Sequence, residues 1–112
     1  MIERFLPRTE FSSYEDFKQN YRVNVPENFN FAYDVMDEWA KECPDDPALY
    51  YCNEGGNDRI LSFLDIKKQS NQIANFLKGK GIKKGDPVML ILMQRVEVWT
   101  TMLALQKIGA II

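Results

Sequence analysis

The sequence contains no histidine, and this absence removes several kinds of chemistry at once. Its 112 residues include 14 Lys and Arg and 16 Asp and Glu, but no His. Histidine is the most frequent general base in enzymes and the most frequent protein ligand of transition metals. Without it, neither a Ser-His-Asp triad nor a Cys-His pair can form within this chain.

Cysteine is almost as scarce. Cys43 and Cys52 are the two cysteines of the chain, too few and too scattered for a disulfide framework or a zinc site. We therefore expect free thiols in a reducing compartment and a cytoplasmic protein. The first residues, MIERFLPRTEF, also lack the apolar stretch of a secretory signal peptide, which favours the same expectation.

A long hydrophobic run is missing too. The most apolar tract, residues 88–112, is interrupted by Arg95, Glu97 and Lys107. It falls short of the ~20 apolar residues that a membrane-spanning helix needs, so we expect no membrane span. A net charge of −2 gives no electrostatic reason to expect nucleic acid or an anionic membrane as a partner. With 46% hydrophobic and 27% charged residues, the composition is typical of a soluble globular protein.

The glycine-rich loops that bind phosphate are absent, since neither G-x-G-x-x-G nor G-x-x-x-x-G-K-[ST] occurs. The stretch KGKGIKKGD brings four lysines close to three glycines and could cradle a phosphate. We interpret it instead as a solvated connector whose cations favour the end of the preceding helix. Its lysines are Lys78, Lys80, Lys83 and Lys84.

Three acidic residues, Asp34, Asp37 and Glu38, could together bind a cation. We interpret them as the solvated face of an amphipathic helix. Arg95 and Glu97 follow a predicted strand, at the edge of an α/β sheet where ligands often bind. Solvation of a helix start is the interpretation that we adopt for them. The sequence therefore predicts no catalytic, cofactor-binding or metal-binding residue.

Large apolar residues admit a functional and a structural interpretation. Methionine adapts to varied apolar shapes, so Met89, Met93 and Met102 could line a groove for an acyl chain. Ordinary core packing is the interpretation that we adopt for them. Trp39 and Trp99 are expected to anchor the core as well.

The first half of the chain predicts helices and a hairpin. A short helix follows Ser12, with Glu15 as its capping-box partner. A second helix runs from about residue 31 to 42, with Asn30 as its cap and one apolar stripe. ALYYC and RILSF flank NEGGND and predict a β-hairpin. A third helix then begins with a capping box formed by Ser62 and Asp65 and ends in GKG.

The second half predicts a βαβ unit. PVMLILM, residues 87–93, is expected to form a strand buried on both faces, as in parallel sheets. RVEVWTTMLALQKIG predicts a helix that ends at Gly109, and AII begins a second strand, connected by a right-handed crossover. Gly85, in KGDPV, is expected to adopt a backbone conformation that other residues resist.

Taken together, these stretches resemble the start of an AMP-forming acyl-CoA synthetase of the adenylate-forming superfamily. The resemblance rests on VPENFNFAYDVMDEWAKECPDDPALYY and on FLDIKKQSNQIANFLKGKGIKKGDPVMLILMQRVEVWTTMLALQKIGAII. NFAYDVMDEWA and QRVEVW are similar to the medium-chain synthetases, whereas the GIKKGDPV and LALQKIGA patterns are shared widely across the superfamily.

The resemblance implies an α/β fold of N-terminal helices, a β-hairpin and the first βαβ unit of a larger N-terminal domain. Residues 1–112 would be an incomplete part of that domain, with 1–28 as an N-terminal extension and 29–112 as the start of the AMP-binding domain. The implied enzyme uses ATP, Mg²⁺ and coenzyme A to activate a carboxylic acid, here a medium-chain fatty acid. The family's phosphate loop, its nucleotide-binding motifs and its catalytic lysine match no position of this chain, so the segment would bind none of these by itself.

Two alternatives remain open. One is another adenylate-forming ligase, acting on aryl or branched acids. The other is a stand-alone, non-catalytic module that binds a partner through an exposed strand edge and an apolar helix. We also expect the isolated segment to self-associate, because its last strand would be interrupted at Ile112.

Overall fold

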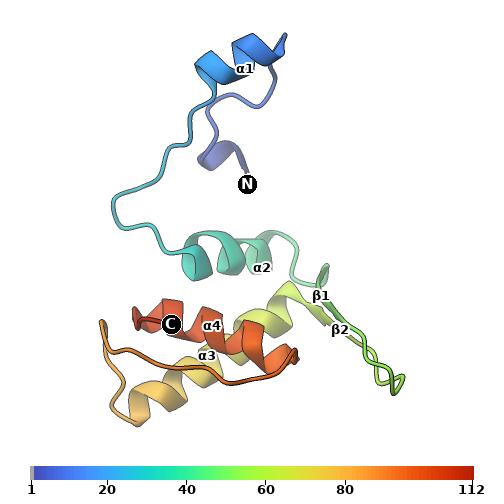
Figure 1. The fold of residues 1–112 in the computed structure, drawn as a ribbon, viewed down its shortest axis with the longest axis vertical. Coiled ribbons are helices and arrows are strands. Elements are labelled where there is room, and N and C mark those ends of the chain that lie inside the picture. The colour runs from blue at the N-terminus through green and yellow to red at the C-terminus, as the bar shows by residue number, and fades with distance from the viewer. Residues whose placement is uncertain (1) are drawn as a thin grey trace.

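The computed structural model describes residues 2–112 and confirms the expected class, a mixture of helices with a small antiparallel sheet. Figure 1 shows two parts: a small N-terminal group of helices, and a larger group in which α2, α3 and α4 lie together beside a projecting hairpin. In chain order the elements are η1 (Ile2–Arg4), α1 (Tyr14–Asn20), η2 (Ala32–Asp37), α2 (Glu38–Glu42), β1 (Pro47–Tyr51), β2 (Arg59–Ser62), α3 (Phe63–Gly79) and α4 (Val96–Ile108).

The chain is not compact. Its radius of gyration is 17.1 Å, whereas a packed domain of about 100 residues has a value of about 13 Å. The N-terminal part is held mainly by its own contacts. The Phe11 ring packs edge-on against Phe17, and Arg8 pairs with Asp16 through two hydrogen bonds of 2.9 and 2.6 Å.

The start of α1 differs from the expectation by one residue. Ser13, not Ser12, caps the helix, and its hydroxyl accepts a hydrogen bond from the N–H of Asp16 at 3.1 Å. Asp16, not Glu15, reaches back, and its carboxylate accepts the N–H of Ser12. Two adjacent serines followed by two adjacent acids offer both registers, and the pairing of Asp16 with Arg8 favours the second.

The second helix begins and ends as predicted, with a difference inside. Asn30 caps it, since its side-chain oxygen accepts the N–H of Ala32 at 3.0 Å. Its first part, η2, is a π-helix, which continues without a break into α2. Hydrogen bonds in a π-helix run from i to i+5, so Asp37 lies on the same side as Ala32. The predicted solvated position of Asp37 is therefore wrong, and its carboxylate is buried.

The hairpin and α3 follow the predictions closely. β1 pairs antiparallel with β2, in a register that places Leu49 opposite Leu61 and Tyr51 opposite Arg59. Ser62 and Asp65 form the expected capping box at the start of α3. The buried residues of α3 are Ile66, Ser70 and Ala74. Together with Ala32, Leu61, Val96 and Leu103, Ile66 forms the apolar core beneath the hairpin.

The predicted buried strand 87–93 is the main correction. The segment is extended, but a single parallel bridge, between Pro87 and Ile111, is all the sheet pairing that it makes within residues 2–112. The side chains of Met89, Ile91 and Met93 are 84–86% exposed. An apolar run of seven residues indicates a strand, but its burial depends on neighbouring strands and covering helices. The described residues supply one short neighbour at one end of the run.

The expected parallel arrangement nevertheless begins at that end. The N–H of Val88 donates to Ile111 at 2.8 Å, and the N–H of Ile111 donates to Asp86 at 2.9 Å. α4 connects the two segments and ends at Gly109, which has a φ of +73°. Gly85 has a φ of +88°, as the sequence predicts. No helix within the described residues is long and apolar enough to cross a membrane.

Candidate functional site

A buried lysine joins three helices. The Nζ atom of Lys107, on α4, donates to Asp37 Oδ1 at 2.8 Å, to Ser70 Oγ at 3.0 Å and to Asn71 Oδ1 at 2.8 Å. The side chain of Lys107 is 1% exposed, and that of Asp37 is 10% exposed. An ammonium group has three protons, so this one is fully satisfied.

This cluster stabilises the packing of the helices and is not arranged to bind a ligand. Each donor of Lys107 already has an acceptor, so the ammonium has no proton free for a ligand. Its three partners come from η2 and α3, and the cluster therefore fixes α4 against both. The sequence did not predict it, although one signal was present. Lys107 is a single cation in the apolar stretch LALQKIG, and such a residue requires a partner when it is buried.

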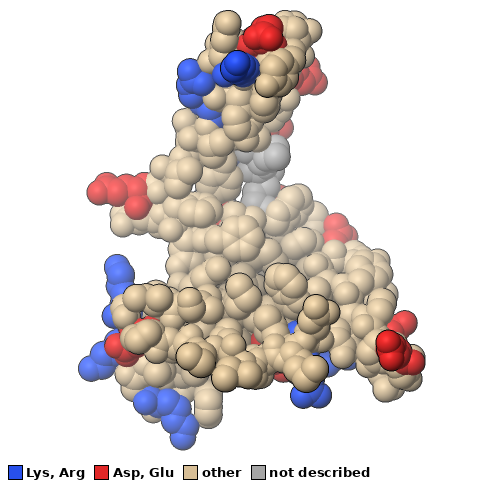
Figure 2. Space-filling view, viewed as in Figure 1, with Lys and Arg blue, Asp and Glu red and all other residues tan. Residues whose placement is uncertain are grey.

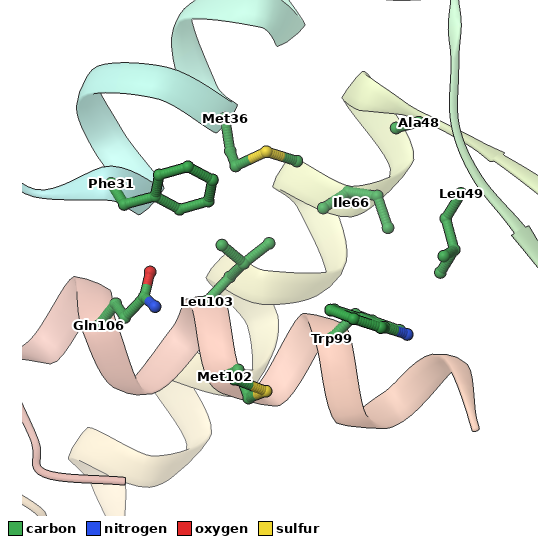
Figure 3. Close-up of a pocket in the computed structure, with 9 residues that line it drawn as sticks. All are labelled: Phe31, Met36, Ala48, Leu49, Ile66, Trp99, Met102, Leu103 and Gln106. Carbon is green, nitrogen blue, oxygen red and sulfur yellow. The ribbon is translucent and has the colours of Figure 1, made fainter. Parts of the chain in front are cut away.

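The clearest hollow of the fold is an apolar cavity of about 250 Å³ between η2, β1, α3 and α4. Figure 3 shows the side chains of Leu103, Trp99 and Gln106 on α4 facing Met36 and Ile66 across this space. The full lining is Phe31, Met36, Ala48, Leu49, Ile66, Trp99, Met102, Leu103 and Gln106.

Gln106 is one of the two lining residues whose side chains carry a nitrogen or oxygen atom, and the other is Trp99. Gln106 Oε1 is buried and has no hydrogen-bond partner among the described residues. The remaining lining side chains are apolar, so the cavity offers mainly shape and apolar contact. It has no group that could activate a nucleophile or hold a phosphate.

The methionines and tryptophans that we assigned to the core do not all lie there. Met102 lines the cavity, but Met89 and Met93 are more than four-fifths exposed. Trp39 stacks on Phe63 with ring centroids 5.7 Å apart, as a core anchor does. Trp99 is 56% exposed. Trp99, Met89 and Met93 lie on surfaces that no described residue covers, so their predicted burial is wrong.

The polar candidates lie apart from the cavity. Lys78, Lys80, Lys83 and Lys84 are all exposed, and Lys84 packs its aliphatic chain close to Gly109. Arg95 and Glu97 are exposed and border a shallow hollow beside Tyr51 and Arg59. Asp34 accepts the N–H of Asn30 at 2.7 Å, which supports the helix start. Within residues 2–112, no group of three or more His, Cys, Asp or Glu is placed to hold a metal ion.

The shifted pKa values belong to groups that stabilise helices. Hydrogen bonds from the Ser62 backbone and hydroxyl lower the pKa of Asp65. The backbone N–H of Ser12 and the side chain of Arg8 lower that of Asp16. A hydrogen bond from Lys41 lowers the pKa of Glu38. Desolvation raises the pKa of the Cys43 thiol, which therefore has little tendency to act as a thiolate nucleophile.

Comparison with known proteins places this arrangement in a family. Residues 36–112 match the family described as AMP-binding enzyme. The chain is 35% identical over 108 residues to the mitochondrial acyl-coenzyme A synthetase ACSM3 of Homo sapiens. That alignment covers 91% of this chain and 18% of the human protein. The chain thus spans less than a fifth of the length of this relative.

Solved structures give the same result for the fold. The N-terminal subdomain of Klebsiella oxytoca NpsA, in complex with 3-hydroxybenzoyl-AMSN, superposes with a TM-score of 0.62 and 31% identity. This superposition covers 69% of the chain and 18% of that protein. Acetoacetyl-CoA synthetase from Streptomyces lividans gives a TM-score of 0.68 and 26% identity, over 73% of this chain and 12% of the synthetase.

Proposed function

Because the chain belongs to the AMP-binding enzyme family, we propose that it forms the N-terminal scaffold of an AMP-forming acyl-CoA synthetase. The observation that carries the proposal is the similarity to acyl-coenzyme A synthetases along 91% of the chain. The structure supports a scaffold role, because its buried lysine cluster and its apolar core hold helices together and present no reactive group. The domain assignment follows: residues 1–28 are an extension, and residues 29–112 begin the AMP-binding domain.

The proposed enzyme works in two steps. The carboxylate of the substrate attacks the α-phosphate of ATP, which forms an acyl-adenylate and releases pyrophosphate. The thiol of coenzyme A then attacks the acyl carbon and displaces AMP. Magnesium, bound with ATP, would stabilise the charge that develops at the phosphoryl centre. The described residues do not form a site that fits Mg²⁺ or a phosphate chain, so we assign neither step to this segment.

We propose a medium-chain fatty acid as the substrate, and two observations bear on this choice. The stretches that resemble medium-chain synthetases, residues 30–40 and 94–99, favour it. An aryl acid is the alternative, since the NpsA subdomain was solved with a 3-hydroxybenzoyl adenylate analogue. The carboxylic acid is thus the small-molecule partner of the proposed enzyme, and no nucleic acid is expected.

The first test is a screen of carboxylic acids by pyrophosphate release, run on the complete open reading frame. Fatty acids of medium length should give the fastest release, and added coenzyme A should yield the acyl-CoA. A preference for benzoates would replace the substrate proposal with the aryl alternative. A stop codon directly after Ile112 would favour the non-catalytic module.

The 112-residue chain by itself should be inert. With ATP, coenzyme A and acids of two to twelve carbons, it should form no acyl-CoA above a control without protein. The reason is that the chain has no phosphate loop and no activated base. Turnover by the purified chain would refute the scaffold role.

The cellular compartment is a separate proposal. Two free thiols, which are typical of a reducing compartment, support the cytoplasm. The human relative carries a mitochondrial name, so fractionation of the native cells should be probed for both compartments.

A further inference from the structure

The burial of residues along η2 fits a π-helix and does not fit an α-helix. Ala32 is 0% exposed and Asp37 is 7% exposed, whereas Tyr33 is 48% exposed. In an α-helix, Ala32 and Asp37 would lie about 140° apart around the axis, with Tyr33 on the arc between them. Both could then be buried only if Tyr33 were buried too. A π-helix aligns residues that are five apart, and this alignment explains the burial that is observed.

The same sequence also has an α-helical register, meaning an apolar face at α-helical spacing. Its apolar residues follow the spacing i, i+4, i+7 and i+8, and they are Ala32, Met36, Trp39 and Ala40. That spacing places all four on one face of an α-helix, with Asp37 outside this face. The segment thus has an apolar face in both registers, and the two registers differ in where they place Asp37.

Two consecutive residues of α4 hold the two ends of η2. Asn30 Nδ2 donates to the backbone carbonyl of Gln106 at 2.8 Å, and Lys107 Nζ donates to Asp37 Oδ1 at 2.8 Å. On the face shown in Figure 2, most charged residues lie at the margins of the larger part, whereas the side chains of Lys107 and Asp37 are 1% and 10% exposed. With Ala32 buried, the contact of Asp37 with Lys107 requires the π register.

We propose that η2 is a two-state element, in which the buried pair of Lys107 and Asp37 selects the π register over the α register. A π-helix is rare, and an unusual backbone conformation persists where the surrounding structure holds it in place. Here the support comes from the ammonium of Lys107. When position 37 carries no acceptor for Lys107, that support is lost and η2 adopts the α register.

The register of η2 also determines one wall of the apolar cavity. Phe31 and Met36 both line the cavity, and they too are five residues apart. In Figure 3 both side chains lie across the space from α4. In the α register they would point about 140° apart, so one of them would leave the wall. Lys107 and Asp37 do not line the cavity, and their ion pair therefore controls its shape from outside.

The test is NMR spectroscopy of the 112-residue chain, using couplings that pass through hydrogen bonds. The N–H of residue 37 donates to the carbonyl of Ala32 in the π register and to that of Tyr33 in the α register. The wild type should show Ala32 as the acceptor, and Asp37→Ala should change the acceptor to Tyr33. Asp37→Asn should keep Ala32, because its amide oxygen still accepts a hydrogen bond from Lys107.

Glu38→Ala is the matched control for these variants. It removes the neighbouring carboxylate, which pairs with Arg4 and Lys41 in partly exposed ion pairs. The acceptor of the residue 37 amide should stay Ala32 in this control. An Asp37→Ala chain that still donates to Ala32 would overturn the proposal.

A deletion tests the two registers while the ion pair stays in place. Without Tyr33, Ala32 and Asp37 are four residues apart, so an α-helix can bury both. The chain that lacks Tyr33 should therefore keep a cooperative urea unfolding transition. Deletion of Lys68, an exposed residue between two buried positions of α3, is the control and should abolish the transition, because it rotates one half of that helix by about 100°.

Equal loss of cooperativity in the two deletion variants would contradict the proposal, since η2 would then have no second register that satisfies its contacts. Neither experiment measures acyl-CoA formation. A negative result would therefore leave the proposed synthetase intact.

Discussion

At the scale of single residues, Lys107 is the side chain on which the packing of the helices depends most. It brings a positive charge into the core and finds one carboxylate and two neutral acceptors there. Removing one partner of a buried ion pair leaves the other charge desolvated and unpaired. That penalty exceeds the net contribution of the intact pair.

Lys107→Met should therefore destabilise the fold by about 3–5 kcal/mol, as breaking a buried ion pair does. Urea unfolding followed by circular dichroism measures the loss. The double variant Asp37→Leu with Lys107→Met should recover most of it, because no charge then stays buried. Lys80→Met, on an exposed lysine, is the control. If the double variant were less stable than the single one, unpaired charge would not be the cause.

Residue-scale prediction from the sequence succeeded where local geometry decides. Gly85 was expected to need an unusual conformation, and its φ is +88°. Prediction from the sequence failed where contact with a distant residue determines whether a side chain is buried. Asp37 looked solvated from helical periodicity, but a π-helix and Lys107, 70 residues away, turn it inward. Neither feature leaves a signal in the residues around Asp37 itself.

At the scale of elements, the start of α3 is the best-defined local structure. The carboxylate of Asp65 accepts hydrogen bonds from the N–H and the hydroxyl of Ser62, both at 3.1 Å. The N–H of Asp65 donates to Ser62 Oγ at 3.2 Å. This capping box was predicted from SFLD because all its groups lie within four consecutive residues.

The capping box of Ser62 and Asp65 predicts that the stability of the fold depends on pH. The pKa of Asp65 is lowered in the folded chain, so its ionised form stabilises the fold. That contribution is complete above the ordinary aspartate pKa of about 3.9 and is lost as pH falls through the lowered value. Asp65→Asn should be less stable than the wild type at neutral pH, and the gap should narrow below about pH 4.

Thermal unfolding of both proteins across this range measures the gap. Asp45→Asn, at an exposed aspartate ahead of the hairpin, is the matched control and should leave the profile of the wild type unchanged. A gap that stays constant down to the lowest pH would show that ionisation of Asp65 does not support the helix.

The element that the sequence misjudged is the strand 87–93. Its apolar pattern is real, and its backbone is extended, but its ladder stops at Val88. Helices and hairpins satisfy their hydrogen bonds from nearby residues, whereas a parallel strand depends on distant neighbours. Local patterns therefore predicted α3, α4 and the hairpin, and could not predict how much of this strand would be paired.

At the scale of the whole molecule, the N-terminal group and the larger group are joined by few contacts. The Phe5 ring meets Phe29 edge-on at 5.5 Å, and Arg4 lies 3.3 Å from Glu38 in a partly exposed pair. Exposed ion pairs contribute little to stability. The boundary that we propose after residue 28 runs through this sparse connection.

Deletion of residues 1–28 should therefore leave the unfolding midpoint of the remainder unchanged within error. The cooperative unit is the apolar core that includes Ile66, Leu61 and Leu103. No residue of this core lies within residues 1–28. Urea unfolding of residues 29–112 beside the full chain measures this. As a control, a deletion that also removes residues 29–42 should abolish the cooperative transition. Loss of cooperativity on deleting 1–28 alone would move the domain boundary toward the N-terminus.

The ribosome synthesises the chain from its N-terminus, so the elements of the fold become available one after another. Asp37 emerges early, and Lys107, its partner in the core, follows 70 residues later. At translation rates of 5–20 residues per second, that gap lasts roughly 4 to 14 s. During this interval α1 and the hairpin can form from their own residues, but the carboxylate of Asp37 has no buried cation to meet. We therefore expect the faces of η2 and α3 that contact Lys107 to stay open to water until α4 has been synthesised.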